Sequence, residues 1–292
     1  MDLSIVLMTY AMQREASRTL LSLLPPQQRG TEGLVYEIIV IDNGSPLPLR
    51  LGEVPGHSVP IRVVRVNDAL PSPVQALNHA VCELAHSENV MVCIDGARMC
   101  SPYMVARSVA QLRQRPDAFV YATSRHLGPK VQMISSREGY DQATEDALLA
   151  GVEWESNLDE LFKISVWAGA CRLGKYYLLN ESNAFSMARG IFVELGKYNE
   201  RFTSPGGGLA NLELFSRAVT RSGGLNVLLA GESTFHQFHG GVATSDQSFF
   251  ARSLKEHELA TGRAYELPEY RFYLDLGIEH GRPADVGRYF DL

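Results

Sequence analysis

Short apolar runs alternate with amphipathic stretches along the first half of the chain. Runs of strand length that are rich in Val and Ile predict buried strands, and apolar residues three or four positions apart predict helices between them. The five strands predicted in this way cover residues 3–8, 36–41, 61–66, 90–94 and 118–123. Near-continuous apolar strands separated by helices indicate an α/β fold with a mostly parallel central sheet flanked by helices.

The second half of the chain is less regular. Residues 125–180 combine acidic helical pieces with an apolar stretch around Trp167, which favours either a substrate-selecting insert or an ordinary surface subdomain. The later sequence NVLLAGESTFHQFHGG predicts two short strands with a turn at Gly231. The tail from residue 246 onward is predicted to be mainly helical, so the α/β domain is expected to carry a helical C-terminal tail.

Composition narrows the class of protein. The 292 residues are 45% hydrophobic and 21% charged, as is ordinary for a globular protein, and the net charge of -6 argues against general nucleic-acid binding. No apolar run approaches the roughly 20 residues of a membrane helix, and MDLSIVLMTY lacks the pattern of a secretory signal. The four cysteines form no Cys-x-x-Cys pair, so reduced thiols and a cytoplasmic location are expected.

Polar side chains gather where the predicted strands end. These residues are Thr9, Tyr10, Asp42, Asn67, Asp68 and Asp95. In a parallel sheet with helices on both faces, ligands bind at the carboxyl ends of the strands. The clustering therefore predicts a site for a small polar ligand, with a nucleotide as the expected class. No Gly-x-Gly-x-x-Gly follows a strand, which argues against a dinucleotide-dependent oxidoreductase.

Five segments, in their order along the chain, resemble family 2 glycosyltransferases of the GT-A fold. They are LSIVLMTYAMQREASRTLLSLL, YEIIVIDNGSP, VQALNHAVCELAHSENVMVCIDGARMCSP, NAFSMARGIFVELGKYNERF and GLANLELFSRAVTRSGG. The order of the five is more specific than any one of them, and together they reach from residue 1 to about 240. The resemblance implies transfer of a sugar from a nucleotide-diphosphate sugar to the hydroxyl of a glycan, lipid or small-molecule acceptor.

The resemblance places donor binding in the first half of the chain. The donor-binding residues expected here are Thr9, Tyr10, Asp42, Asp68, Asp95 and Gly96. Asp42 matches the contact to the nucleotide base, although Asp-Asn-Gly-Ser also favours a simple turn. Asp95 matches the first acid of the DxD motif, which lies beside the ribose and the metal-bound diphosphate.

The sequence departs from the family pattern at two positions. The second DxD acid is replaced by Ala97, and the Glu-Asp pair that begins a later helix is replaced by Ala210-Asn211. That aspartate is the general base of inverting members, and asparagine cannot take a proton. Asn211, as the expected helix N-cap, and Glu213 are the catalytic candidates, although an acid in a first helical turn is also stabilising.

The same helix leaves the stereochemical course open. NLELFSR also resembles the Gly-Glu-Asn-x-Glu helix of the retaining polypeptide N-acetylgalactosaminyltransferases. In a retaining reaction the leaving diphosphate serves as the base, so no carboxylate is needed at this helix. The sequence is therefore compatible with both an inverting and a retaining mechanism.

The sequence FHQFHGG contains two candidate metal ligands, His236 and His239. Neutral imidazole binds divalent transition metals, and some retaining GT-A enzymes supply a late histidine to the metal. Along a strand these two side chains would point to opposite faces, so only one of them, preferably His236, is expected beside Asp95 unless the chain bends at Gln237. The expected cofactor is Mn²⁺ or Mg²⁺, and His239 is otherwise expected to contact donor phosphate or acceptor.

These roles define the expected domain organisation. One GT-A domain is expected over 1–244, with a nucleotide-binding half over 1–124 and an acceptor and metal half over 125–244. A helical extension over 245–292 is expected to offer a surface for homo-oligomerisation. The alternative to an enzyme is a catalytically inactive nucleotide-sugar-binding or scaffold protein of the same fold.

Overall fold

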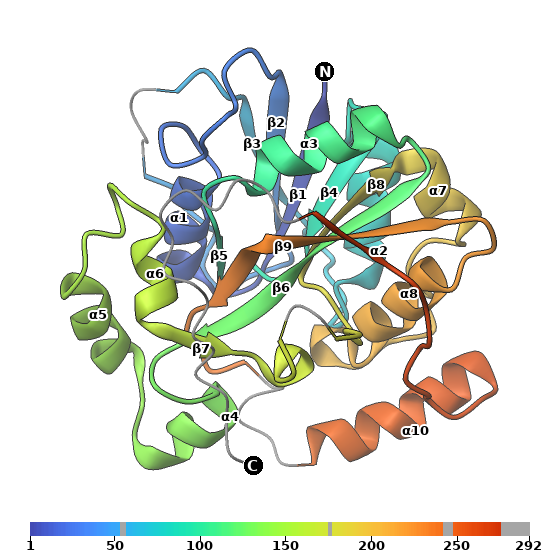
Figure 1. The fold of residues 1–292 in the computed structure, drawn as a ribbon. Helices are drawn as coiled ribbons and strands as arrows, with labels where there is room; N and C mark the ends of the chain where they lie inside the picture. The colour runs from blue at the N-terminus through green and yellow to red at the C-terminus, as the bar shows by residue number, and fades with distance from the viewer. Residues whose placement is uncertain (53–56, 175–176, 242–247, 276–292) are drawn as a thin grey trace.

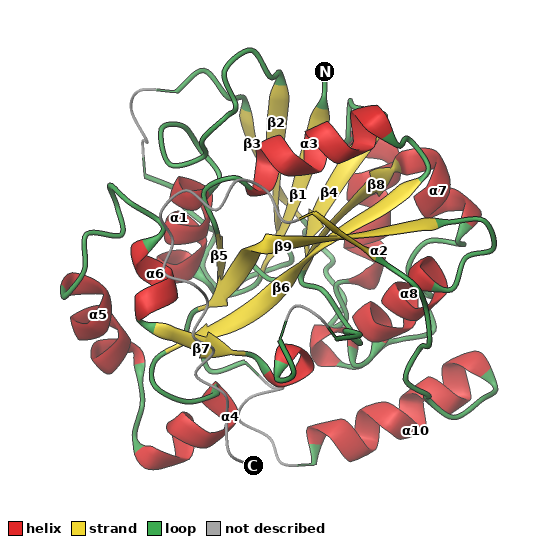
Figure 2. Ribbon diagram, in the orientation of Figure 1, coloured by secondary structure: helices red, strands yellow, loops and turns green. Residues whose placement is uncertain are grey.

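The computed structural model describes residues 1–52, 57–174, 177–241 and 248–275. Within these residues one ten-stranded sheet forms the centre of the molecule, and helices cover both of its faces (Figures 1 and 2). The strands are β1 (Leu3–Thr9), β2 (Tyr36–Asp42), β3 (Ile61–Arg65), β4 (Asn89–Cys93), β5 (Arg98–Cys100), β6 (Ala118–Leu127), β7 (Ser165–Trp167), β8 (Ala184–Ala188), β9 (Leu225–His236) and β10 (Tyr273–Asp275).

The sheet is mixed and mostly parallel. Its strand order is β10-β9-β6-β8-β4-β1-β2-β3, with β5 paired to β9 and β7 paired to β6. β1 runs parallel to β2 and β4, whereas β8 is antiparallel to both β4 and β6. The five strands predicted from the apolar runs are present, and the α/β fold is confirmed. Because β1 and β2 are parallel, their carboxyl ends meet at one edge, where Thr9 pairs with Asp42.

Two apolar cores lie on opposite faces of the sheet. The helices are α1 (Gln13–Ser22), α2 (Val74–His79, continued by a π-helical turn), α3 (Met104–Gln114), α4 (Gln132–Ser135), α5 (Gln142–Ala150), α6 (Glu160–Lys163), α7 (Arg189–Glu194), α8 (Ala210–Val219) and α10 (Phe249–Thr261). Along β1, Ile5 and Leu7 join the core under α1 and α3, whereas Val6 and Met8 join the core under α2, α7 and α8. Burial on both faces explains why the strand is apolar at successive positions.

The strand β9 differs from the expected pair of short strands. It continues through Gly231, and its parallel register with β6 shifts between Ala122 and Thr123. This irregularity has the character of a β-bulge, which takes up extra residues without ending a strand. The expected turn at Gly231 is therefore wrong, and the strand continues as far as His236.

The insert packs against the end of this long strand. Residues 125–180 include α4, α5, α6 and β7, which lie beside the ends of β6 and β9 (Figure 1). They share a small apolar core made of Met99, Leu127, Leu149, Trp154, Leu158, Leu161 and Phe235. Phe235 directly precedes His236, so the insert supports the end of β9 from which a predicted metal ligand projects.

The C-terminal extension is helical only at its start. α10 agrees with the expectation, but Tyr273–Asp275 form β10, which is parallel to β9 at the edge of the sheet. Aromatic residues between α10 and β10 pack against the core and draw the chain back to the sheet. Residues 276–292 of the expected helical tail lie outside the described residues. Within the described part of the chain, no helix is long and apolar enough to span a membrane.

Candidate metal and donor site

The short strand β5 brings the two halves of the site together. β4 ends at Cys93, Asp95 lies in the following turn, and Arg98 begins β5. Arg98 pairs with His236 in the antiparallel register of β5 and β9. The Gln237 N–H continues this ladder by donating to the Ala97 carbonyl oxygen at 2.8 Å. The pairing therefore holds the turn that carries Asp95 against the segment that carries both histidines.

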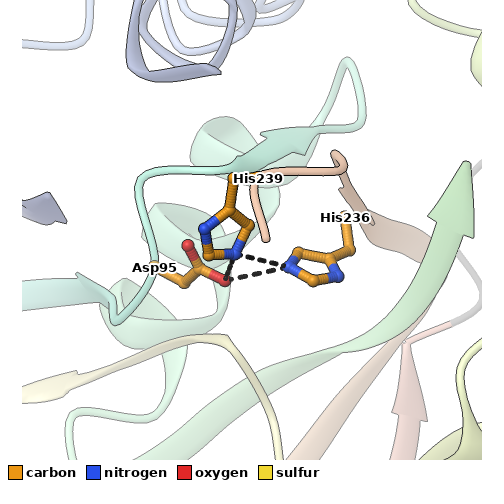
Figure 3. Close-up of side chains that lie close together, drawn as sticks. All are labelled: Asp95, His236 and His239. Carbon is orange, nitrogen blue, oxygen red and sulfur yellow. Dashed lines mark hydrogen bonds and ion pairs between the residues drawn. The ribbon is translucent and has the colours of Figure 1, made fainter. Parts of the chain in front are cut away.

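The side chains of Asp95, His236 and His239 point toward one another (Figure 3). Asp95 Oδ2 lies 3.3 Å from His236 Nε2 and 3.9 Å from His239 Nε2, and the two Nε2 atoms are 3.1 Å apart. Strand alternation predicted that only one histidine would face Asp95 unless the chain bends at Gln237. The strand β9 ends at His236, so the side chains beyond it no longer alternate, and both histidines face Asp95.

Burial and charge set the protonation of these groups. Burial, together with the nearby positive charge of Arg98, lowers the pKa of His236 to about 3, so its imidazole is neutral near pH 7. Burial acts to raise the pKa of Asp95, but His239, His236 and Arg98 together hold it well below its usual range. A neutral imidazole and an ionised carboxylate are the forms that bind a metal.

The three groups fit a divalent cation. Among the described residues, they form the one group of three His, Cys, Asp or Glu side chains whose ligand atoms all lie within 4.8 Å of one another. Two imidazoles and one carboxylate suit transition metals and leave positions open for other ligands. Neighbouring ligands at about 2.1 Å from an octahedral ion lie about 3 Å apart. The separations of 3.1 and 3.3 Å agree with this, and the third, at 3.9 Å, is wider.

The turn around Asp95 depends on close packing. Asp95 Oδ1 accepts a hydrogen bond from the Ala97 N–H at 2.9 Å, and Ala97 is completely buried. A Cβ on Gly96 would lie 2.6 Å from Thr9 Cγ2 and 2.9 Å from the Met8 carbonyl oxygen. Gly96 thus allows the turn to pack on the end of β1.

The other expected donor-binding residues also lie at the carboxyl ends of strands, but their side chains differ in exposure to solvent. Thr9 is buried and donates from Oγ1 to the Ile41 carbonyl oxygen at 2.9 Å. Tyr10 is 54% exposed, and Asp68 is exposed in the turn after β3. These positions leave the ring of Tyr10 and the carboxylate of Asp68 accessible to a ligand.

Asp42 is engaged within the protein. Its carboxylate accepts the N–H groups of Ser45 at 2.9 Å and Leu49 at 3.2 Å, and it binds Arg65 Nη1 at 2.8 Å. Burial acts to raise its pKa, but these hydrogen bonds and the Arg65 charge lower it below its ordinary value. The turn geometry that the sequence left open is thus present, and a contact from Asp42 to a base stays a prediction.

The two catalytic candidates on α8 also have internal partners. Asn211 is not the N-cap, because α8 begins at Ala210. Its Nδ2 donates to the Ser182 carbonyl oxygen at 3.0 Å. Glu213 binds Arg217 at 2.7 and 2.6 Å. Catalytic roles for both residues stay predictions, and the geometry gives Glu213 a structural ion pair.

One residue beside the site, His126, was not foreseen. His126 Nδ1 accepts the Gln132 N–H at 2.9 Å, and the His126 ring centroid lies 5.1 Å from that of His236. Burial lowers the pKa of His126 well below its ordinary value, so the ring is neutral and carries its proton on Nε2.

Solved glycosyltransferase structures share this fold. Residues 1–349 of S. aureus TarS in complex with UDP-GlcNAc align with a TM-score of 0.53 over 91% of this chain and 68% of that one, at 12% identity. GalNAc-T7 with UDP, GalNAc and Mn²⁺ aligns with a TM-score of 0.53 over 88% of this chain, at 14% identity. This chain covers 48% of GalNAc-T7.

These similarities establish the GT-A glycosyltransferase fold that the sequence segments led us to expect. No protein-family model and no curated protein matches the sequence. A proposal for its activity therefore rests on the fold and on the convergence of Asp95, His236 and His239.

Proposed function

We propose that the protein transfers a sugar from a nucleotide-diphosphate sugar to a hydroxyl acceptor with the help of a divalent metal. The observation that supports this most is the convergence of Asp95, His236 and His239 within 4.8 Å. The similar structures bind UDP or UDP-GlcNAc, and one of them also holds Mn²⁺. UDP-sugars and Mn²⁺ are therefore the donor class and ion to test first.

The residues of this chain would bind and orient the donor. In a GT-A sheet the nucleotide lies across the carboxyl ends of the strands, here near Tyr10 and Asp68. Asp95, His236 and His239 would hold the ion, and Arg98 adds positive charge through its 3.2 Å contact from Nε to Asp95 Oδ2. A bound ion would supply positive charge to the departing diphosphate.

A binding protein without activity is the second candidate. It is favoured by the absence of a second DxD acid at Ala97 and by the amide at Asn211. The metal-ligand geometry favours an enzyme, because sugar transfer requires charge at the diphosphate whereas nucleotide binding does not. Release of UDP from a UDP-sugar separates the two candidates.

Thermal unfolding with nucleoside diphosphates tests donor binding. We expect UDP with Mn²⁺ to stabilise the protein by about 2.7 kcal/mol when the ligand concentration is about 100 times its dissociation constant. EDTA should reduce this stabilisation, and so should His236→Ala and His239→Ala. His79→Ala is the matched control, because His79 is exposed on α2. No stabilisation by any nucleoside diphosphate would contradict the proposed function.

A further inference from the structure

The chain leaves the sheet between the two histidines of the metal site. β9 ends at His236, and the Gln237 N–H donates to the Ala97 carbonyl oxygen at 2.8 Å. Phe238 and His239 lie beyond the strand. Two imidazoles that bind one ion must keep a fixed separation, so the backbone between them has to be held by groups outside the sheet.

The backbone of Phe238, the residue before His239, is held at both of its polar atoms. Its N–H donates to Glu145 Oε2 at 2.7 Å, and its carbonyl oxygen accepts from Arg14 Nη2 at 2.8 Å. Arg14 Nη2 also lies 2.8 Å from Glu145 Oε1, which closes a ring of three contacts. Arg14 comes from α1 and Glu145 from α5. Together these two side chains form what we call the Phe238 clamp.

The clamp is itself fixed by further contacts. Arg14 binds Glu15 Oε1 and Asp146 Oδ1, each at 2.8 Å. The Glu145 side chain is completely buried, and the Tyr140 hydroxyl lies 3.4 Å from its Oε2. Because a polar group that is buried without partners costs free energy, these contacts favour one arrangement of the clamp.

The helix α1 holds the other residue between the histidines as well. The Gln237 side chain is completely buried, and its Nε2 donates to the Glu15 carbonyl oxygen at 3.0 Å and to Thr19 Oγ1 at 3.1 Å. Ordering a flexible backbone costs conformational entropy, and a site that is ordered before its ligand arrives binds that ligand more tightly. The segment between the two imidazoles is therefore ordered by the fold itself.

We propose that Arg14 and Glu145 are positioning residues that preform the pair of imidazoles, an inference that rests on the metal site of the proposed function. They act through the backbone of Phe238, whereas Asp95 and the two histidines bind the ion. His239 is the ligand that they control most directly, because it follows Phe238 in the chain. Through α5, the insert over 125–180 thus sets the metal affinity of the site.

The test measures the dissociation constant of Mn²⁺ alone, without nucleotide, by electron paramagnetic resonance on the full chain. Arg14→Ala and Glu145→Ala should each weaken Mn²⁺ binding by about 10–100-fold, the usual effect of changing a residue that supports a metal ligand. Arg18→Ala is the matched control. Arg18 also joins α1 to α5, but through Asp146 at 2.7 Å rather than through Phe238, so this variant should bind Mn²⁺ like the wild type.

A double-mutant comparison distinguishes positioning from general support of the fold. If the clamp acts through His239, Glu145→Ala should cost little further affinity in a His239→Ala background, because the ligand it positions is already gone. Changes at independent sites add, whereas changes that act on one contact do not. An equal loss of Mn²⁺ affinity in both backgrounds would assign Glu145 a purely structural role and overturn the inference.

Two conservative variants extend the test to milder changes. Glu145→Gln keeps an oxygen that can accept the Phe238 N–H, so it should recover part of the Mn²⁺ affinity that Glu145→Ala loses. Arg14→Lys keeps the charge but not the planar fork that reaches several acceptors, so it should still weaken binding. These two variants carry the test if either alanine variant fails to fold, and wild-type affinity in both would then overturn the inference.

The results separate this inference from the function on which it rests. Wild-type Mn²⁺ affinity in Arg14→Ala and Glu145→Ala, with affinity lost in His236→Ala and His239→Ala, overturns the clamp alone. Failure of the wild-type protein to bind Mn²⁺ removes the metal site of the proposed function, and the clamp with it.

Discussion

The two carboxylate oxygens of Asp95 have different partners. One acid can therefore both stabilise the turn and face the two histidines. Oδ1 forms the turn by accepting the Ala97 N–H, whereas Oδ2 faces His236 and His239. Ala97 is fully buried, and its N–H and carbonyl oxygen are both hydrogen-bonded. The site therefore gains its remaining ligand atoms from two imidazoles, one at the end of β9 and one in the segment that follows it.

Removing either imidazole should weaken metal binding. Changing a residue that only supports a ligand typically costs 10–100-fold in metal affinity, so loss of a direct ligand should exceed about 100-fold. We expect this from His236→Ala and from His239→Ala, measured by Mn²⁺ electron paramagnetic resonance. His79→Ala should bind Mn²⁺ like the wild type. Equal affinity in all three variants would place the ion elsewhere.

Gly96 should be intolerant of a side chain. Gly96→Ala would press a Cβ against Thr9 and the Met8 carbonyl oxygen, and overpacking of this kind costs about 1–3 kcal/mol. Gly190→Ala is the matched control, because a Cβ at Gly190 meets nothing within 4 Å. Urea unfolding of both variants checks the difference, and equal stability of the two would contradict the packing argument.

At the scale of secondary structure, the sequence predicts elements better than their pairing. Strands β1, β2 and β4 were foreseen because both of their faces are buried and their apolar runs are continuous. β5 and β10 have three residues each, which is too short for a periodic pattern. The antiparallel pairing of β5 with β9 is what assembles the site, and no local pattern encodes it.

The same limit explains which site residues were foreseen. Asp95 and the two histidines were predicted from a strand end and a motif, and the meeting of Asp95 with one imidazole was predicted with them. The approach of the second imidazole depended on a bend after His236, which a local sequence pattern does not encode. His126 was missed because its nearness to His236 arises from the pairing of β6 with β9, which no local pattern encodes.

Helix α5 supports the end of β9 through a titratable contact. Glu145 accepts the Phe238 N–H at 2.7 Å and binds Arg14 at 2.8 Å. Burial raises the pKa of Glu145 to about 7, although the Phe238 N–H and the charges of Arg14 and Arg18 act to lower it. Asp146 on the same helix also binds Arg14 and Arg18. The chain between the two histidines is thus held by a carboxyl group that titrates near neutral pH.

This contact predicts a pH-dependent stability. The folded-state pKa of Glu145 lies above its ordinary value of 4.5, so the stability it contributes is fully present below pH 4.5 and is lost as the pH rises through 7. Relative to Glu145→Gln, the wild type should lose at most roughly 3 kcal/mol between pH 4.5 and 8. Urea unfolding at pH 5 and pH 8 measures the change. A constant difference between the two proteins would contradict it.

At the scale of the whole molecule, the site joins segments from distant parts of the chain. Asp95 comes from the expected nucleotide-binding half, both histidines come from the second half, and one sheet carries them all. The segment after α10 reaches back to the residues that precede β8. There, the Tyr270 hydroxyl donates to the Leu179 carbonyl oxygen at 3.0 Å and accepts the Leu179 N–H at 2.9 Å. Homo-oligomerisation through the tail stays a prediction.

Tyr270→Phe should show that this segment supports the fold. It leaves the N–H and the carbonyl oxygen of Leu179 without their partner, at a cost of about 1–3 kcal/mol. Tyr273→Phe is the control, because Tyr273 is 58% exposed. Thermal unfolding compares the two variants, and no loss of stability in Tyr270→Phe would contradict a supporting role.

The most direct test of the account is anomalous diffraction from a crystal of the protein grown with UDP and Mn²⁺. The account predicts one manganese peak between Asp95 Oδ2, His236 Nε2 and His239 Nε2, with the UDP diphosphate bound to the same ion and the uracil near the ends of β1 and β2. A manganese peak away from these three atoms, or UDP bound without the ion at this place, would contradict it.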